Sequence, residues 1–275
     1  SGAHLEPALE AIRAGRHLLV EKPLEVTLKR CDAIIDAAHK AGVRVSGVFQ
    51  SRFYDGPRVL KEAVQAGRFG RMVLGDAYVK WFRSQQYYDQ GGWKGTRRLD
   101  GGGALMNQSI HAVDLLQWYM GPVRAVQAAR GVLGHERIEV EDTAVAAVEF
   151  ESGAFGVIEG TTAIFPGFLK RIELSGTKGS VILEEEDLKT WKFDPEQPAD
   201  LQIRERHAQK TATGGGAADP AAISSEGHRR QLEAFVGALQ AGREPEPSAE
   251  EARQAVEIVL AVYRSADRGR KVRLV

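Results

Sequence analysis

The sequence predicts an α/β segment followed by a larger α+β segment, that is, a piece of a doubly wound parallel sheet and then a mostly antiparallel sheet. In the first 50 residues, short apolar runs of strand length alternate with stretches of helical periodicity. From residue 67 to residue 193 the chain consists mainly of strand-like runs, several of them separated by short turns. We therefore expect one domain over 1–50 and a second over 51–275, whose C-terminal helices pack back on the first.

The composition excludes several classes of protein. The 275 residues suffice for about two domains, and 37 Lys and Arg balance 37 Asp and Glu, so no net charge attracts nucleic acid or an anionic membrane surface. No apolar run approaches the ~18 residues of a membrane-spanning helix. Cys31 is the only cysteine, which excludes a disulfide framework and favours a reducing compartment. We expect a cytoplasmic globular protein without nucleic-acid or membrane partners.

The first domain is expected to begin with a helix over 5–13 and to continue with a strand over 17–20, a helix over about 27–40 and a strand over 43–49. Two strands joined by a helix form a crossover whose strands are parallel and whose connection is right-handed. This crossover is the repeating unit of a doubly wound sheet.

The second domain is expected to consist mainly of antiparallel strands. Residues 151–153 and 176–179 are typical hairpin turns, so the strands on either side of each turn run antiparallel. A helix over about 57–66 precedes the strands, and a helix over 104–119 interrupts them. The expected strands cover residues 72–82, 123–132, 143–150, 154–164, 171–174 and 180–184.

The C-terminal part of the chain is expected to be helical. A loop rich in Gly, Ala, Ser and Thr over 207–227 is expected to be mobile. Two helices follow it, and Ser248 and Glu251 form a capping box at the start of the second one. A short strand over 272–274 closes the chain.

Lys22 lies at the end of a predicted parallel strand, in the tripeptide Glu21-Lys22-Pro23. Ligands of open parallel sheets bind beyond the carboxyl ends of the strands, so Lys22 is expected to point into a ligand crevice. Gln50 and Arg52 follow the next strand and would border the same crevice. The alternative is that the tripeptide is an ordinary surface segment.

Asn107, His111 and Asp114 are spaced i, i+4 and i+7, so they would share one face of a regular helix. A histidine can take a proton from a substrate hydroxyl, an amide can hold that hydroxyl, and a carboxylate can orient the imidazole. The glycines at 101–103 would let the backbone approach a ligand closely. The alternatives are a core histidine satisfied by Asp114 and a glycine turn without a ligand. A metal site would need a third ligand that the pattern does not supply, so we expect none.

Aromatic and basic side chains follow the strand that ends near residue 82. Trp81, Arg83, Tyr87, Tyr88 and Trp93 are suited to stacking on sugar rings and to binding hydroxyls or carboxylates. The alternative is that they pack against the glycine loop or against a neighbouring subunit.

Four segments, taken in order, resemble the Gfo/Idh/MocA family of oxidoreductases. They are A-[IL]-x-A-G-[RK]-H-[VL]-[LI]-x-E-K-P ending at Pro23, F-Q-S-R-F over 49–53, G-R-F-G over 67–70, and G-G-G-x-L-x-[DN]-x-x-x-H-x-x-D ending at Asp114. The resemblance implies a Rossmann domain joined to an open-faced sheet domain with helices on one face. It also implies hydride transfer between NAD or NADP and a secondary alcohol or ketone of a sugar, polyol or sugar derivative.

The resemblance implies roles for individual residues. Lys22 would hold the substrate hydroxyl near the nicotinamide, with a cis bond to Pro23, and His111 would transfer the proton. Asn107 stands where many family members have Asp, and because an amide is not a base, Asn107 would position the substrate. We assign further substrate contacts to Arg52, Tyr88, Trp93 and Asp114, and cofactor contacts to Glu21, Lys22, Pro23 and Gln50.

The Gly-rich phosphate-binding loop of the family would precede Ser1, and no segment of this chain supplies one. We therefore expect a truncated chain that keeps the last part of the Rossmann domain and is inactive alone. The alternatives are a non-catalytic nucleotide- or sugar-binding regulator and an NAD-assisted glycoside hydrolase of the same fold. The open sheet face predicts a homodimer or homotetramer formed through that face.

Overall fold

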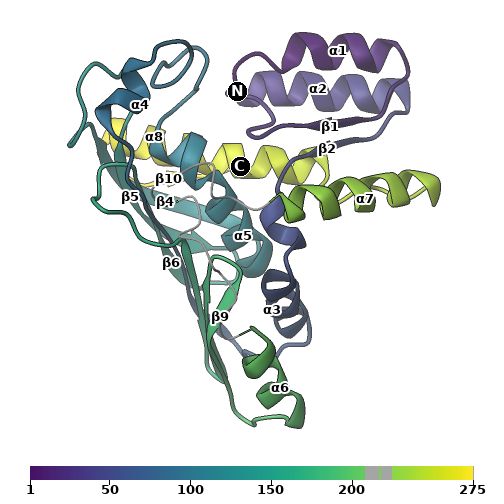
Figure 1. Ribbon diagram of the computed structural model, residues 1–275, viewed down its shortest axis with the longest axis vertical. Coiled ribbons are helices and arrows are strands. Elements are labelled where there is room, and N and C mark those ends of the chain that lie inside the picture. Colours follow the sequence, from purple (N-terminus) through teal and green to yellow (C-terminus); the bar gives the residue numbers. More distant parts are fainter. Residues whose placement is uncertain (208–216, 218–224, 275) are drawn as a thin grey trace.

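The computed structural model describes residues 1–207, 217 and 225–274. Figure 1 shows a small N-terminal layer of helices and strands beside one end of a long sheet. Helix α8 (Ala249–Arg268) contacts both parts: α2 (Leu28–Ala41) and β2 (Val45–Gly47) of this layer, and β4 (Val123–Gly131) of the long sheet. The two parts of the molecule are therefore joined by a shared helix as well as by the chain itself.

The N-terminal layer is a parallel crossover. It consists of α1 (Leu5–Arg13), β1 (Leu18–Val20), α2 (Leu28–Ala41) and β2 (Val45–Gly47). The strands β1 and β2 pair in parallel, which confirms the predicted arrangement. Helix α2 begins where the Thr27 side chain accepts the N–H of Arg30, and it ends at Gly42, whose φ of 65° is readily adopted only by glycine.

The long sheet is mostly antiparallel, as predicted. Its eight strands lie in the order β10-β4-β5-β6-β3-β7-β8-β9. Both expected hairpins are present, as β5–β6 and β7–β8. One pair, β3–β6, is parallel, and the chain passes through three helical segments and two other strands between them. The strand bounds are β3 (Met72–Lys80), β4 (Val123–Gly131), β5 (Thr143–Phe150), β6 (Phe155–Thr161), β7 (Arg171–Gly176), β8 (Gly179–Glu184), β9 (Asp187–Phe193) and β10 (Val272–Arg273).

Helices cover one face of this sheet (Figure 1). Helix α5 (Ile110–Met120) contacts β3, and α8 contacts β4. Along β5, Ala144, Ala146 and Val148 are buried on the covered face, whereas Val145 alternates with them and is exposed. Phe155 of β6 is also exposed, at 58%. Alternation of this kind is typical of an antiparallel sheet with one covered face.

The prediction of one regular helix over 104–119 is wrong for its first six residues. Residues Ala104–Ser109 form a π-helix, and α5 begins only at Ile110. A Cβ at Gly103 would lie 1.7 Å from the Glu141 carbonyl oxygen, and one at Gly102 would lie 2.2 Å from the Tyr263 hydroxyl. These glycines therefore allow close packing of protein on protein rather than the approach of a ligand.

Two helices that the sequence did not predict are α4 (Gln85–Asp89) and α6 (Pro198–His207). Helix α6 carries no apolar stripe and is anchored by the buried Asp200, which accepts hydrogen bonds from Trp191 Nε1 and Arg68. This anchor is a tertiary contact, so no local pattern announces it.

The remaining helices link the sheet to the N-terminal layer. The 3₁₀ turn Gln50–Phe53 leads from β2 into α3 (Asp55–Gln65), and α7 (Glu226–Gln240) packs against that turn. The predicted capping box at Ser248 and Glu251 is present. Most of the loop expected over 207–227 lies outside the described residues. Within the described part of the chain, no helix has the length and apolar character needed to cross a membrane.

Candidate active site

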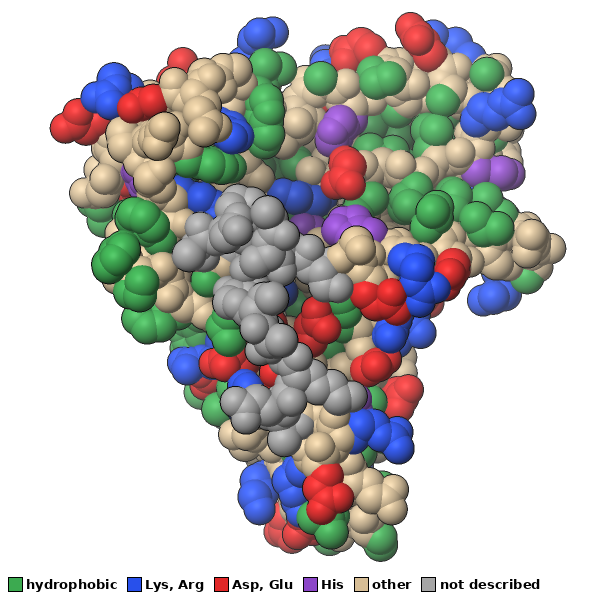
Figure 2. Space-filling model, in the orientation of Figure 1, with side chains coloured by type: hydrophobic (Ala, Val, Ile, Leu, Met, Phe, Trp, Pro, Cys, Tyr) green, Lys and Arg blue, Asp and Glu red, His purple; other side chains and the backbone are tan. Residues whose placement is uncertain are grey.

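A cavity of about 390 Å³ lies where the N-terminal layer meets the sheet domain. Figure 2 shows basic, acidic and histidine side chains gathered at this junction. The cavity is formed by the chain beyond β1, the 3₁₀ turn after β2, the segment after β3, the π-helix and the start of α7. Its lining residues are Glu21, Lys22, Gln50, Trp81, Arg83, Tyr87, Asn107, Gln108, His111, Ser225 and His228.

Lys22 extends from the end of β1 to the π-helix. Its Nζ donates to the backbone oxygen of Asn107 at 2.7 Å and to Oδ1 of the same residue at 3.0 Å. The Lys22–Pro23 peptide is cis, as the resemblance implied. Burial lowers the pKa of Lys22, and the carboxylates of Glu21 and Asp100 oppose this shift. Since an ammonium group has three N–H bonds and Asn107 accepts two, one remains for a ligand oxygen.

His111 lies on the first turn of α5 and lines the same cavity. Its ring meets the ring of Phe49 edge-on, with the centroids 5.6 Å apart, and its buried Nδ1 has no hydrogen-bond partner among the described residues. Burial lowers the pKa of His111 well below its usual value, and the nearby Lys22 and Lys170 lower it further. The imidazole is therefore neutral at physiological pH and able to accept a proton.

Asn107 is held between Lys22 and a buried carboxylate. Its Nδ2 donates to Oδ1 of Asp100 at 3.0 Å, while Oδ2 of Asp100 accepts the backbone N–H of Gly95 at 2.9 Å. Burial raises the pKa of Asp100 to about 6. Asp100 directly precedes the glycine run in the sequence, and only the fold brings it close to the lysine.

Arg52 and Asp114 do not line the cavity, and their predicted contact with substrate is corrected by the structure. Nε and Nη2 of Arg52 donate to the two carboxylate oxygens of Asp114 at 2.8 and 2.6 Å, and Nη1 donates to Glu251 at 2.8 Å. Both members of the pair are at most 4% exposed. Asp114 therefore does not orient His111, and the alternative of a core histidine satisfied by Asp114 is wrong as well. The π-helix shifts Asn107 relative to α5, so the three residues do not act from one face.

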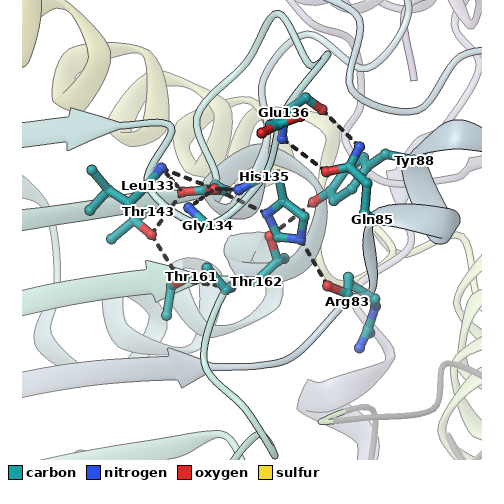
Figure 3. Close-up of polar contacts among 12 residues, drawn as sticks. Arg83, Gln85, Tyr88, Leu133, Gly134, His135, Glu136, Thr143, Thr161 and Thr162 are labelled. Carbon is teal, nitrogen blue, oxygen red and sulfur yellow. Dashed lines mark hydrogen bonds and ion pairs between the residues drawn. The ribbon is translucent and has the colours of Figure 1, made fainter.

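Tyr88 and Trp93 also lie away from the cavity. The Tyr88 hydroxyl is 2.9 Å from Oγ1 of Thr162, and its ring packs edge-on against His135, as Figure 3 shows. Trp93 is 41% exposed and is not a lining residue. Tyr87, the neighbour of Tyr88, lines the cavity instead.

A buried polar cluster holds the segment that carries Tyr87 (Figure 3). Nδ1 of His135 is 3.0 Å from Oδ2 of Asp142, and its Nε2 is 2.8 Å from the backbone oxygen of Arg83. Asp142 also accepts the backbone N–H groups of Leu133, Gly134 and His135. This cluster fixes the segment that follows β3, and with it the cavity wall at Arg83 and Tyr87.

Among the residues expected to contact cofactor, Glu21, Lys22 and Gln50 line the cavity. Pro23 is buried behind the wall, where its carbonyl oxygen is 3.0 Å from Nδ1 of His4. Sequence reasoning missed Gln108, Ser225 and His228. The last two come from the start of α7, which no local pattern places beside residue 22. In the described parts of the chain no cluster of three or more potential metal-ligating residues occurs.

Three further polar atoms in the cavity wall are buried without a hydrogen-bond partner among the described residues. They are Nε1 of Trp81, Oε1 of Gln50 and Oε1 of Gln108. Unsatisfied buried donors and acceptors are costly and rare in native proteins. Their presence together in one cavity indicates that a polar ligand completes the site.

Comparison with known proteins finds similarity to a family of oxidoreductases. Residues 1–49 match the family model "Oxidoreductase family, NAD-binding Rossmann fold", and residues 58–182 match "GFO/IDH/MocA C-terminal domain". The solved WlbA dehydrogenase from Bordetella pertussis, in complex with NADH and UDP-GlcNAcA, is 36% identical with a TM-score of 0.89, over 100% of this chain and 77% of that one.

Two curated relatives are also similar. Myo-inositol 2-dehydrogenase from Thermotoga maritima is 27% identical over 100% of this chain and 77% of its own length. 1,5-Anhydro-D-fructose reductase from Ensifer adhaerens is 32% identical over 65% of this chain. The match spans 53% of that reductase.

Proposed function

Because this chain belongs to the GFO/IDH/MocA family of oxidoreductases, we propose that it carries the catalytic site of an NAD(P)-dependent dehydrogenase acting on a secondary alcohol of a sugar, polyol or sugar derivative. The observation that carries this proposal is the convergence of the Lys22 ammonium, the Asn107 amide and the neutral His111 imidazole on one cavity. Lys22 lies at the end of a parallel strand, where ligands of such sheets bind.

The residues beyond β1 and β2 fit the nicotinamide end of the cofactor. Gln50 presents a buried acceptor oxygen without a partner among the described residues, and a nicotinamide carboxamide carries N–H donors. Glu21 and Lys22 lie beside it in the cavity wall. These residues would hold the nicotinamide, which would supply the hydride acceptor for oxidation of the alcohol carbon and the hydride donor for the reverse reaction.

The protein residues handle the proton and the charge on oxygen. As the C–H bond breaks, His111 takes the proton of the alcohol O–H, and the Lys22 ammonium stabilises the negative charge that develops on that oxygen. Asn107 holds Lys22 in place and is not a base. In the reverse direction protonated His111 returns the proton to the new alkoxide.

The cavity wall favours a substrate with several hydroxyl groups. Trp81 offers its Nε1 as a donor, and Gln108 offers its Oε1 as an acceptor. Neither of these two atoms has a hydrogen-bond partner among the described residues. Tyr87 adds an aromatic ring beside them, and such rings stack on the C–H faces of sugars. The names of the relatives support this class, since they describe proteins acting on inositol and anhydrofructose.

The test is a dehydrogenase assay on the protein as its gene encodes it. The assay supplies NAD⁺ or NADP⁺ together with a panel of polyols, hexoses, anhydrosugars and UDP-linked sugar acids. We expect reduction of the dinucleotide with at least one member of the panel, together with formation of the matching ketone. Two results would contradict the proposal: release of free sugar with no net change in the dinucleotide, which is glycoside hydrolysis, and binding of a ligand without turnover, which is the behaviour of a regulator.

A further inference from the structure

A buried carboxylate lies behind Asn107, on the side away from Lys22. Asp100 is 2% exposed and lies in the loop that joins α4 to the π-helix. One carboxylate oxygen accepts Nδ2 of Asn107 and the other accepts the N–H of Gly95, so both oxygens are engaged. Lys22, Asn107 and Asp100 thus form a continuous row of ammonium, amide and carboxylate.

The carboxylate determines which way the Asn107 amide points. An ionised carboxylate accepts hydrogen bonds and cannot donate them, so it selects the NH₂ end of the amide. The amide oxygen is then directed at the Lys22 ammonium, where the distance is 3.0 Å. If the amide were reversed, its NH₂ group would face the ammonium, and two donors would oppose each other.

The two opposite charges of the row are separated by a neutral amide. Lys22 is a buried cation whose immediate side-chain partner, Asn107, is neutral. A buried charge without a compensating charge is strongly disfavoured. Two carboxylates act on the Lys22 ammonium, the solvent-exposed Glu21 and the buried Asp100 behind Asn107. The charged groups that act on Asp100 are Lys22, Glu141 and the Ser1 amino group.

We propose that Asp100 is a positioning residue of this site: it orients the Asn107 amide toward Lys22 and adds a buried negative charge to that of the exposed Glu21 in compensating the ammonium. If residue 107 were an Asp, its carboxylate would contact the lysine directly. Here the carboxylate belongs to Asp100, and it acts on the lysine through the Asn107 amide. The inference rests on the proposed function where it is tested by kcat, but not where it is tested by the titration of Lys22.

An exchange of the two side chains tests this arrangement. In the double variant Asp100→Asn/Asn107→Asp, the carboxylate at 107 accepts from Lys22, and the amide at 100 donates to 107 and accepts from Gly95. Every hydrogen bond and the total charge are kept. The single variant Asp100→Asn removes the charge, and Asn107→Asp places two carboxylates side by side.

The first readout is the pH dependence of Lys22 acylation by acetic anhydride, followed by mass spectrometry, because only the neutral amine reacts. Removing a nearby negative charge makes the ammonium lose its proton more easily, so Asp100→Asn should move the labelling midpoint down by about one pH unit. Asn107→Asp should raise the labelling midpoint. The midpoint of the exchange variant should be no lower than that of the wild type. Asp89→Asn, which removes an exposed carboxylate from α4, should leave the midpoint unchanged.

The second readout is the kcat of the dehydrogenase reaction. We expect Asp100→Asn to lower kcat by about tenfold or more, and the exchange variant to recover most of the loss. An unchanged labelling midpoint in Asp100→Asn, or an exchange variant no more active than Asp100→Asn, overturns the inference. If Asp100→Asn fails to fold, the exchange variant decides, because failure of that variant to fold or to label as expected also overturns it. Labelling shifts without dehydrogenase activity in the wild type would refute the proposed function and leave this inference standing.

Discussion

Nζ of Lys22 lies 3.0 Å from Oδ1 of Asn107, although the two residues are 85 positions apart. The lysine follows a strand of the N-terminal layer, and the asparagine belongs to the π-helix of the sheet domain. Each part of the molecule thus supplies one side of the cavity. The site exists only when the two parts are packed together, and α8 maintains that packing by contacting both.

Replacing His111 by Ala should abolish turnover without unfolding the protein. A positioned acid or base contributes about 10²–10⁴-fold to the rate, so kcat should fall by about that factor. His39→Ala, which removes an exposed histidine on α2 beside Glu250, is the matched control and should leave kcat unchanged. The measurement is steady-state kinetics together with a thermal melt, and equal turnover by His111→Ala would remove the role assigned to the imidazole.

Lys22→Met keeps the length of the side chain and removes its charge. We expect a loss of about 10²–10³-fold in kcat, because the ammonium stabilises charge that develops on the substrate oxygen. Lys22→Arg should not restore the rate, since the planar guanidinium cannot reproduce the compact contacts to Asn107. Steady-state kinetics check both variants, and a fully active Lys22→Met would contradict the account.

The Arg52–Asp114 pair should matter for folding rather than for substrate. Asp114→Ala leaves a buried guanidinium without one of its partners, so we expect a loss of about 3–5 kcal/mol in the free energy of unfolding. Asp267→Ala, which breaks the exposed pair with Arg130, should cost about 0–1 kcal/mol. Urea denaturation measures both. A large rise in KM for Asp114→Ala at unchanged stability would instead support the substrate contact expected from the sequence.

The ionisation of Asp100 should affect activity and stability in opposite directions. Burial raises the pKa of Asp100 to about 6, well above the usual value of an aspartate. Activity should fall as the pH drops through about 6, because the charge that compensates Lys22 is lost, while His111 stays neutral. Because folding favours the protonated acid, the contribution to stability is greatest below about pH 4 and declines as the pH rises through 6.

A pH–rate profile and unfolding curves between pH 4 and 8, each compared with Asp100→Asn, check this prediction. The variant should lose the acidic limb of the rate profile and the corresponding decline in stability. An unchanged acidic limb in Asp100→Asn would assign that ionisation to another group.

The exposed sheet face should be an interface between copies of the protein. Leu74 of β3 lies directly opposite Phe155 of β6, and both side chains are exposed. We expect a dimer or tetramer in sedimentation velocity at micromolar concentration, and dissociation when Phe155 is replaced by Glu. Leu201→Glu, at an equally exposed apolar position on α6, should leave the oligomer intact. A monomeric wild type would contradict the prediction.

The elements that local patterns specify could be predicted from the sequence. The crossover of β1 and β2 follows from apolar runs and from the stop signal at Gly42, and the hairpins follow from short turns. The placement of Lys22 beside the cavity follows from the rule for strand ends. These features depend on residues close to one another in the chain.

The features that could not be predicted depend on tertiary contacts. One wide turn shifts Asn107 relative to α5, and apolar spacing over six residues does not distinguish a π-helix from an α-helix. The partner of Asp114 is 62 residues away. Tyr87 and Tyr88 have the same local pattern, and the packing of Tyr88 against His135 decides which of them faces the cavity.

The central claim is that Lys22 and His111 act on one alcohol in one cavity. A double-mutant cycle on kcat/KM, with Lys22→Met, His111→Ala and the double variant, tests it most directly. Residues that act on the same reacting group are strongly non-additive, so the double variant should be about as slow as the slower single variant. If the fold-loss in kcat/KM of the double variant equalled the product of the two single fold-losses, the two groups would act independently, which would contradict the claim.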